Sequence, residues 1–416
     1  MAQASVLTPD YARNMRIVGH SDQGGRADGV QVMVSGGYAY VGHVYSGGFS
    51  VIDVRNPAAP VFVRHIPQPP HTWSQHLQTH GDLLLVVNMK DMLRDQTLSA
   101  GEYYSGSIGD KLDLSQTSTS YSAGMRVYDI GDRANPREIG FMPLPGLGVH
   151  RIWYAGGQWA YVSALPPGFT DDILVIVDMS DPTHPQPVSQ LWLPGMNSAA
   201  GEKPTWDPRL RYALHHPIVK GDLACAAWRD GGVTTIDVSD RHHPRLLAHR
   251  NFAPPFAGGT HNALPLPDRG LMVVVEEAVF DDCKDGIKHN WVFDIRDPSN
   301  PVSIATLPIP SDADYAHKGG QFGPHNIHEN RPESYQSSER LYVTYQNAGM
   351  RVYDIQDPFR PLEIAALVPP APRTMMDYRP DRPRVVDTTD VFVAEDGLIY
   401  CTDSNAGLYI LALEGV

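Results

Sequence analysis

One short pattern recurs along this chain of 416 residues and constrains its fold more than any other feature. An apolar run ends in an aspartate, and a proline follows seven residues later. The aspartate side chain can bind backbone N–H groups of a tight turn, and the proline fixes φ where the next strand begins. Each copy therefore predicts a strand, a turn and a returning strand. The six copies are spaced 49 to 76 residues apart and end at Asp53, Asp129, Asp178, Asp237, Asp294 and Asp354.

The residues around each copy predict four short strands joined by turns, which is the content of one propeller blade. In the first unit these strands cover residues 30–34, 38–41, 49–53 and 60–63. The last unit supplies only three strands, over residues 391–393, 398–400 and 408–411. Residues 14–19 resemble the missing outer strand, and pairing them with the C-terminal strands would remove an open sheet edge.

The sequence therefore predicts an all-β fold, a seven-bladed β-propeller that is closed by pairing an N-terminal strand with the C-terminal blade. Residues 1–416 would then form a single domain. The predicted blade units cover approximately residues 26–68, 69–145, 146–195, 210–253, 258–310, 322–369, and 385–416 together with strand 14–19.

One copy of the apolar run reads Leu174-Val175-Ile176-Val177-Asp178. The repeats resemble those of the LVIVD family, which is named for the motif that this segment reproduces letter for letter. The resemblance covers nearly the whole chain through the six repeats, and it implies a β-propeller. It implies little about activity, because a propeller is a scaffold that hosts many functions.

Composition and charge exclude several classes of partner. A net charge of −14 repels phosphate backbones and anionic lipid surfaces, so we expect neither a nucleic-acid nor a membrane partner. Cys225, Cys283 and Cys401 lack C-x-x-C spacing, which argues against a thiolate zinc cluster. The N-terminus has no basic region followed by an apolar run, and no stretch approaches about 18 consecutive apolar residues. These features predict a soluble cytoplasmic protein.

A histidine stands at the predicted start of the inner strand in five of the seven units. The chain holds 18 histidines in 416 residues, so chance explains this recurrence poorly. Closely spaced imidazoles repel one another when protonated, and a bound cation relieves that repulsion while keeping them neutral. We therefore predict a metal site on the propeller axis. The predicted ligands are His76, His150, His216, His261, His325 and, in the last unit, Asp390.

Spacing favours His216 over the adjacent His215, because His76 and His216 each stand five residues before the glycine of the next turn. A histidine-rich site without thiolate suits a divalent transition metal. An aspartate among the ligands favours Fe or Mn, while Cu and Zn stay open. The alternative is a polar channel filled with water and histidine hydrogen bonds.

Nearly all the long insertions fall on the face where the inner strands begin, and the insertion over residues 91–122 is a candidate lid. Glu276 and Glu277 end an apolar strand beside that face, where one of them could orient a ligand histidine or act as a base. Arg151 and Arg229 could bind a substrate carboxylate.

Together these features predict a metal-dependent enzyme that acts on a small organic molecule, most simply through oxidative, oxygenase-like chemistry. A metal-dependent hydrolase or lyase is the runner-up, and a non-enzymatic propeller used for binding or as a scaffold is the alternative of another class. Convergence of the histidine nitrogens on one point would favour the enzyme.

Overall fold

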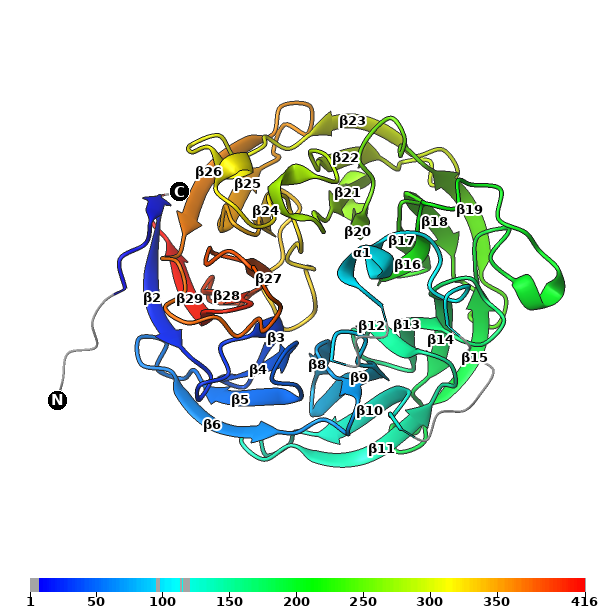
Figure 1. Ribbon diagram of the computed structural model, residues 1–416, viewed down its shortest axis with the longest axis horizontal. Coiled ribbons are helices and arrows are strands. Elements are labelled where there is room, and N and C mark those ends of the chain that lie inside the picture. The colour runs from blue at the N-terminus through cyan, green and yellow to red at the C-terminus, as the bar shows by residue number, and fades with distance from the viewer. Residues whose placement is uncertain (1–6, 95–97, 113, 115–119, 416) are drawn as a thin grey trace.

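The computed structural model describes residues 7–94, 98–112, 114 and 120–415, and strands dominate it. The predicted all-β class is confirmed. Antiparallel sheets surround a common centre, with the first strand of each repeat unit innermost and the last at the rim (Figure 1). Parts of the predicted lid, at residues 95–97, 113 and 115–119, lie outside the described residues.

The first three repeat units follow the predicted order of short strands. The first consists of β3 (Gly29–Ser35), β4 (Tyr38–His43), β5 (Phe49–Asp53) and β6 (Val61–Ile66). The second consists of β7 (Thr72–Trp73), β8 (Leu77–His80), β9 (Leu83–Lys90), β10 (Gly124–Asp129) and β11 (Arg137–Pro143). The third consists of β12 (Gly148–Trp153), β13 (Trp159–Leu165), β14 (Ile173–Asp178) and β15 (Gln186–Leu191).

The remaining units continue this order around the centre. The fourth holds β16 (Tyr212–Lys220), β17 (Leu223–Arg229), β18 (Val233–Asp237) and β19 (Arg245–Arg250). The next holds β20 (Thr260–Leu266), β21 (Leu271–Glu276), β22 (Asn290–Asp294) and β23 (Val302–Thr306). Two further groups are β24 (Arg340–Thr344), β25 (Met350–Asp354) and β26 (Leu362–Val368), and β27 (Thr388–Val393), β28 (Ile399–Asp403) and β29 (Gly407–Leu413).

Helices are short and lie in the connections. The α-helix is α1 (Ala100–Tyr104), which begins with a capping box in which Ser99 and Glu102 bind each other's backbone N–H groups. In the part of the chain that the structure describes, four 3₁₀ turns are η1 (Ser198–Ala200), η2 (Pro267–Arg269), η3 (Asp281–Cys283) and η4 (Tyr315–His317). Within the described residues, no helix is both long and apolar enough to cross a lipid bilayer.

The repeated aspartate does what its spacing predicts. In all six copies its Oδ1 accepts a hydrogen bond from the backbone N–H two residues later, over 2.7 to 3.0 Å. In every copy the outer strand begins at the residue after the proline that follows the aspartate by seven residues. Each third strand also carries a register shift against its outer strand, for example between Ile176 and Val177. One turn design therefore shapes the units one after another.

The N-terminal segment pairs with two different units. Strand β2 (Met15–Ser21) pairs antiparallel with β29, so Met15 lies opposite Leu413. Strand β1 (Tyr11–Arg13) pairs with β26, a contact that the sequence did not predict. Both strands add to outer edges and leave fewer backbone groups there without a ladder partner.

The core lies between neighbouring sheets. Strand β14 is buried from Ile173 to Val177 because its two faces pack against the adjacent units, which explains its continuous apolar run. The outer strand β15 is largely exposed over its first five residues. The inner strands thus surround the centre, and most of the side chains that they place there are polar.

Candidate metal centre

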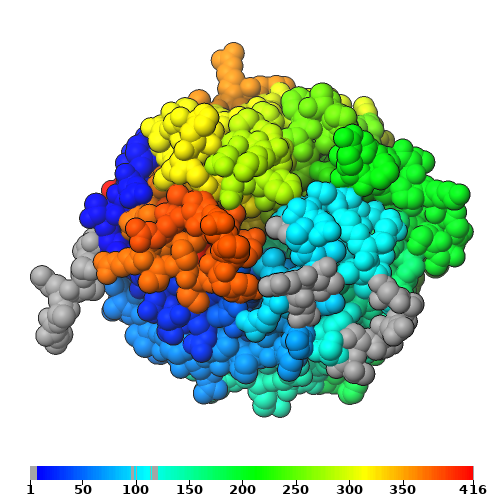
Figure 2. All heavy atoms as spheres, viewed as in Figure 1, coloured from blue at the N-terminus to red at the C-terminus, as the bar shows by residue number. Residues whose placement is uncertain are grey.

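A cavity of about 120 Å³ lies at the centre of the face shown in Figure 1, and residues from every repeat unit line it. Tyr103 and Tyr104 of α1 and Arg379 reach it from the connecting segments. On the surface, the α1 segment in cyan and the segment around residues 370–385 in orange lie on either side of this centre (Figure 2). We refer to this space as the central cavity.

Each repeat unit brings two consecutive residues to the centre, either on its innermost strand or in the segment before a strand, and these residues form two layers. The first member of every pair lines the central cavity, and we call this set the cavity layer. It consists of Val30, Gln75, His150, His215, His261, His325 and Thr389. The residue after each of these belongs to the layer beneath, which we call the Arg151 layer. It consists of Gln31, His76, Arg151, His216, Asn262, Asn326 and Asp390.

Backbone irregularity places the cavity layer. Arg151 and His216 lie directly opposite residues of the second strand of their unit, as do Asn262 and Asp390. The residue before each of them falls within a register shift, so it has no direct cross-strand partner. Such a bulge re-aims a side chain, and here it turns His150, His215 and His261 toward the cavity.

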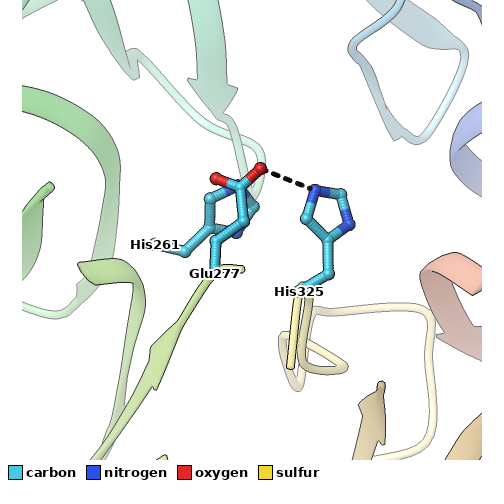
Figure 3. A group of neighbouring side chains, drawn as sticks. All are labelled: His261, Glu277 and His325. Carbon is cyan, nitrogen blue, oxygen red and sulfur yellow. Dashed lines mark ion pairs between the residues drawn. The ribbon is translucent and has the colours of Figure 1, made fainter. Parts of the chain in front are cut away.

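Three residues of neighbouring units form a group that could hold a metal ion (Figure 3). Glu277 follows β21, His261 lies on β20, and His325 precedes β24. The Glu277 carboxylate lies 3.3 Å from Nε2 of His261 and 3.6 Å from Nε2 of His325. One donor atom from each of the three residues lies within 4.8 Å of the others. Two imidazoles and a carboxylate form a donor set suited to Fe(II) or Zn.

Hydrogen bonds at Nδ1 leave Nε2 of these histidines free to bind a metal. Nδ1 of His261 donates to Oδ1 of Asn262 over 3.0 Å, and Nδ1 of His325 donates to the Thr389 carbonyl. Nδ1 of His215 donates to the His261 carbonyl over 2.8 Å. A neutral imidazole carries one proton, so each Nε2 keeps its lone pair. Metal-binding histidines are commonly fixed in this way by a carbonyl or carboxylate at the other nitrogen.

His150 and His215 extend the row of imidazoles beyond this group. The His215 ring stacks on His261 with 3.6 Å between centroids, and His150 lies 4.9 Å from His215. Nδ1 of His150 contacts the Met89 sulfur at 3.3 Å, while its buried Nε2 has no partner within the described residues. An unpaired buried acceptor is unfavourable, and a cation would satisfy it.

The Arg151 layer has a different chemistry. Arg151 is 1% exposed and donates to Nδ1 of His76 over 3.0 Å and to Nδ1 of His216 over 3.1 Å. A guanidinium can only donate, so both imidazoles carry their proton on Nε2. Although both were predicted as ligands, His76 offers the cavity an N–H donor, and His216 does not line it.

Asp390, the predicted oxygen ligand, also lies in the Arg151 layer. Its Oδ2 accepts a hydrogen bond from the Val32 backbone N–H over 2.9 Å. Burial raises the pKa of Asp390 to about 7, although Arg151 opposes the rise. Glu277 instead provides the carboxylate beside the histidines. It directly follows β21, the second strand of the unit that holds His261, and this strand ends at the cavity.

Burial favours the neutral form of four histidines that line the cavity. It lowers the pKa of His76, His150, His215 and His261 well below the ordinary value, and neighbouring arginine or histidine charges lower it further. A metal binds the neutral imidazole, so these residues need not lose a proton before binding one near neutral pH.

Two of the four predicted catalytic residues meet at the cavity. Arg229 ends β17 with a φ of 50°, and its Nη1 donates to the Glu277 carboxylate. Glu276 lies outside the cavity lining, where it accepts hydrogen bonds from the His289 backbone and the Trp291 indole. Burial raises the pKa of Glu276 to about 7. Arg151 lies beneath the cavity, as described above.

Sequence reasoning missed the aromatic residues of the cavity wall. Tyr103 and Tyr104 lie in the long insertion on the predicted face. The Ser99-x-x-Glu102 pattern is a helix-start signature and could have located α1. Arg379 comes from a proline-rich connection without periodicity, so nothing in the sequence placed it at the centre.

Comparison with known proteins identifies the repeats. A family model for the LVIVD repeat matches residues 24–66, 152–190 and 218–249, which confirms the resemblance seen in the sequence. No curated protein sequence matches the chain significantly.

Several solved structures are similar in fold. A hypothetical selenium-binding protein from Sulfolobus tokodaii is 14% identical, with a TM-score of 0.55 and 91% of each chain covered. A chain of a mitotic checkpoint complex is 9% identical, with a TM-score of 0.55 over 100% of this chain and 96% of that one. A periplasmic gluconolactonase from Pseudomonas aeruginosa is 11% identical, with a TM-score of 0.51 and 96% of each chain covered. Such low identities show a propeller-like fold alone.

Proposed function

Starting from a chain that carries LVIVD repeats on a propeller-like fold, we propose a metal-dependent enzyme that acts on a small organic molecule in the central cavity. The observation that carries the proposal is the approach of His261, Glu277 and His325, with both histidine Nε2 atoms free to bind a metal. His150 and His215 lie next to this group and could provide further nitrogen ligands for the metal.

The donor set favours oxidative chemistry. Two histidines and one carboxylate with open positions are typical of non-haem Fe(II) oxygenases, so Fe is the preferred metal and Mn the next. A metal held there would supply a Lewis acid with positions open to O₂ or substrate. Arg229 donates a hydrogen bond that can hold the Glu277 carboxylate in place, and Tyr103 and Tyr104 line the cavity around the site.

Hydrolysis or lyase chemistry is the second candidate. Two histidines and a glutamate are also a catalytic zinc set, in which a bound water attacks a carbonyl. The structural relative named a gluconolactonase supports the idea that this fold can hold an enzyme, although it does not define the reaction here. A binding protein without catalysis is the third candidate, and a metal-free central cavity would favour it.

The scaffold belongs to the same proposal. We infer a single domain of seven blades, in which the β2–β29 pairing closes the ring. The repeat units and the innermost position of their first strands support this arrangement. A cytoplasmic location and a small-molecule partner likewise stay proposals.

Metal analysis of two matched variants tests the function. We expect about one Fe or Mn per chain in the purified protein. His261→Gln should lower the affinity for the metal by more than about 100-fold, because it removes a ligand rather than a supporting group. His216→Gln is the control, since His216 is equally buried but lies in the Arg151 layer.

The outcomes separate the candidates. The absence of stoichiometric metal from the wild-type protein would contradict the enzyme, as would equal metal loss in both variants with thermal melts unchanged. Nitric oxide, which binds Fe(II) where O₂ would bind, should give a paramagnetic resonance signal. Bound zinc without such a signal would favour the hydrolase or lyase.

A further inference from the structure

We propose that the central cavity binds a small carboxylic acid no bulkier than a single ring, with its carboxylate against Arg229 beside the metal group. This inference rests on the proposed function and specifies its substrate class. Four observations carry it: the free donors of Arg229, the charge balance, two further N–H groups at the cavity, and the size of the cavity.

Arg229 has N–H groups that are not used in hydrogen bonds to the described residues. Its side chain is 8% exposed and lines the cavity. Nη1 donates to Glu277, and the guanidinium makes no other hydrogen bond to the residues that the structure describes. Because a guanidinium carries five N–H groups in a planar fork, several remain for a ligand. A carboxylate is the group that such a fork recognises best.

The charges around the cavity call for an anion once a metal is bound. Four formally charged residues line it, and they are Arg229, Arg379, Glu277 and Asp387. Their formal charges cancel. A divalent ion would leave an excess of two positive charges in a buried space, where charge is poorly screened. An anionic ligand lowers that excess, whereas a neutral ligand does not.

Two further N–H groups of the lining residues can donate to a ligand. Arg151 donates to Nδ1 of His76, which leaves Nε2–H of His76 as a donor at the cavity. The buried indole N–H of Trp73, another lining residue, has no partner among the described residues. A carboxylate accepts through both oxygens and has no proton to donate, so it matches these groups.

Size and wall composition limit the rest of the ligand. A cavity of roughly 150 Å³ is known to hold benzene, and the central cavity measures about 120 Å³. Trp73 and Tyr103 meet edge to face with 6.1 Å between ring centroids, and Leu93 and Tyr104 also line the space. These apolar surfaces suit a flat ring or a short hydrocarbon chain.

Benzoate and its neutral counterpart benzamide provide the test, by calorimetric titration of the metal-loaded protein. We expect benzoate to bind about 10- to 100-fold more tightly than benzamide, the range of a charge-assisted contact. Arg229→Gln should remove that preference, and Arg229→Lys should restore part of it because the charge returns. Arg209→Gln is the control, since Arg209 forms an exposed pair with Asp207 and does not line the cavity.

Metal content is measured in every variant, so the two proposals can fail separately. Equal affinity for benzoate and benzamide in the metal-loaded wild type would overturn the carboxylate site while leaving the metal centre intact. An unchanged preference in Arg229→Gln with its metal retained would also overturn it. If the wild type holds no metal, the enzyme proposal fails, and a benzoate preference dependent on Arg229 in the metal-free chain would still support the carboxylate site.

Discussion

Each histidine around the central cavity has one ring nitrogen engaged by the protein, and the chemistry of that partner decides what the other nitrogen can do. A carbonyl accepts a hydrogen bond from Nδ1–H of His215 or His325, which leaves the lone pair at Nε2. A guanidinium donates to His76 and leaves an N–H there. Neighbouring histidines therefore differ in their chemistry. His215 and His325 present an acceptor at Nε2, whereas His76 presents a donor there because Arg151 occupies its Nδ1.

Asp28 offers a test of residue-scale electrostatics away from the cavity lining. Its carboxylate is buried and accepts hydrogen bonds from the backbone N–H groups of Tyr45 and Ser46, each over 2.6 Å. Nδ1 of His43 lies 3.2 Å away. Burial alone would raise the pKa of Asp28, but the hydrogen bonds and charge of its neighbours, His43 foremost, lower it to about 2.

We expect Asp28→Asn to lower the free energy of unfolding at pH 7 by about 2 kcal/mol, the equivalent of the pKa shift. Because the folded-state pKa is depressed, the stabilisation is full above the unfolded value near 3.8 and disappears as the pH falls toward 2. Denaturant unfolding of both proteins between pH 6 and pH 2 measures the difference. A gap that stays constant over this range would refute the assignment.

At the scale of strands and turns, the sequence was most informative where the chain is most regular. The Asp–Pro spacing predicted six turns, and the hydrogen bonds at Asp53, Asp178 and their counterparts confirm them. The inner strands depart from that regularity. A register shift between Tyr212 and His216 makes His215 the cavity residue of its unit, whereas the glycine spacing had favoured His216.

Spacing cannot reveal such a shift in β16, because the strand is buried on both faces from Tyr212 to Val219 and shows no alternation of apolar and polar residues that an extra residue would interrupt. Glu277 was identified as a candidate alongside Glu276, and only the three-dimensional structure separates them. One carboxylate faces His261, and the other binds the Trp291 indole. The metal group joins residues far apart in the chain, so its geometry depends on how neighbouring units pack.

The N-terminal strands provide a prediction at the element scale. Deleting residues 1–21 removes β2, exposes the edge of β29, and loses the burial of Met15, which is 2% exposed. We expect a loss of about 3 kcal/mol or more in the free energy of unfolding. Deleting residues 1–14 removes only β1 from the edge of β26 and should destabilise the protein less. Equal stability of the two truncated proteins would show that the β2–β29 ladder adds nothing.

For the whole molecule, metal binding and stability should be linked. The donors come from separate repeat units, so an ion that binds only the folded chain adds to its stability. At a free metal concentration about 100 times the Kd, the gain is about 2.7 kcal/mol, which we expect to raise the Tm by about 3–5 °C. Calorimetry with added metal and with chelator measures the change. Glu277→Gln should abolish the rise, and a rise of the same size in this variant would place the ion elsewhere.

The pairing of β2 with β29 also determines when this part of the sheet can form during protein synthesis. Met15 leaves the ribosome early, but its partner Leu413 is translated almost 400 residues later. At typical rates of synthesis the interval is about 20–80 s, during which β2 has no ladder to join. Each intermediate unit can form its own hairpins meanwhile, because their contacts are local. This ladder must wait for the synthesis of β29, so a nascent chain that stalls before β29 would leave an open strand edge that can pair with other chains.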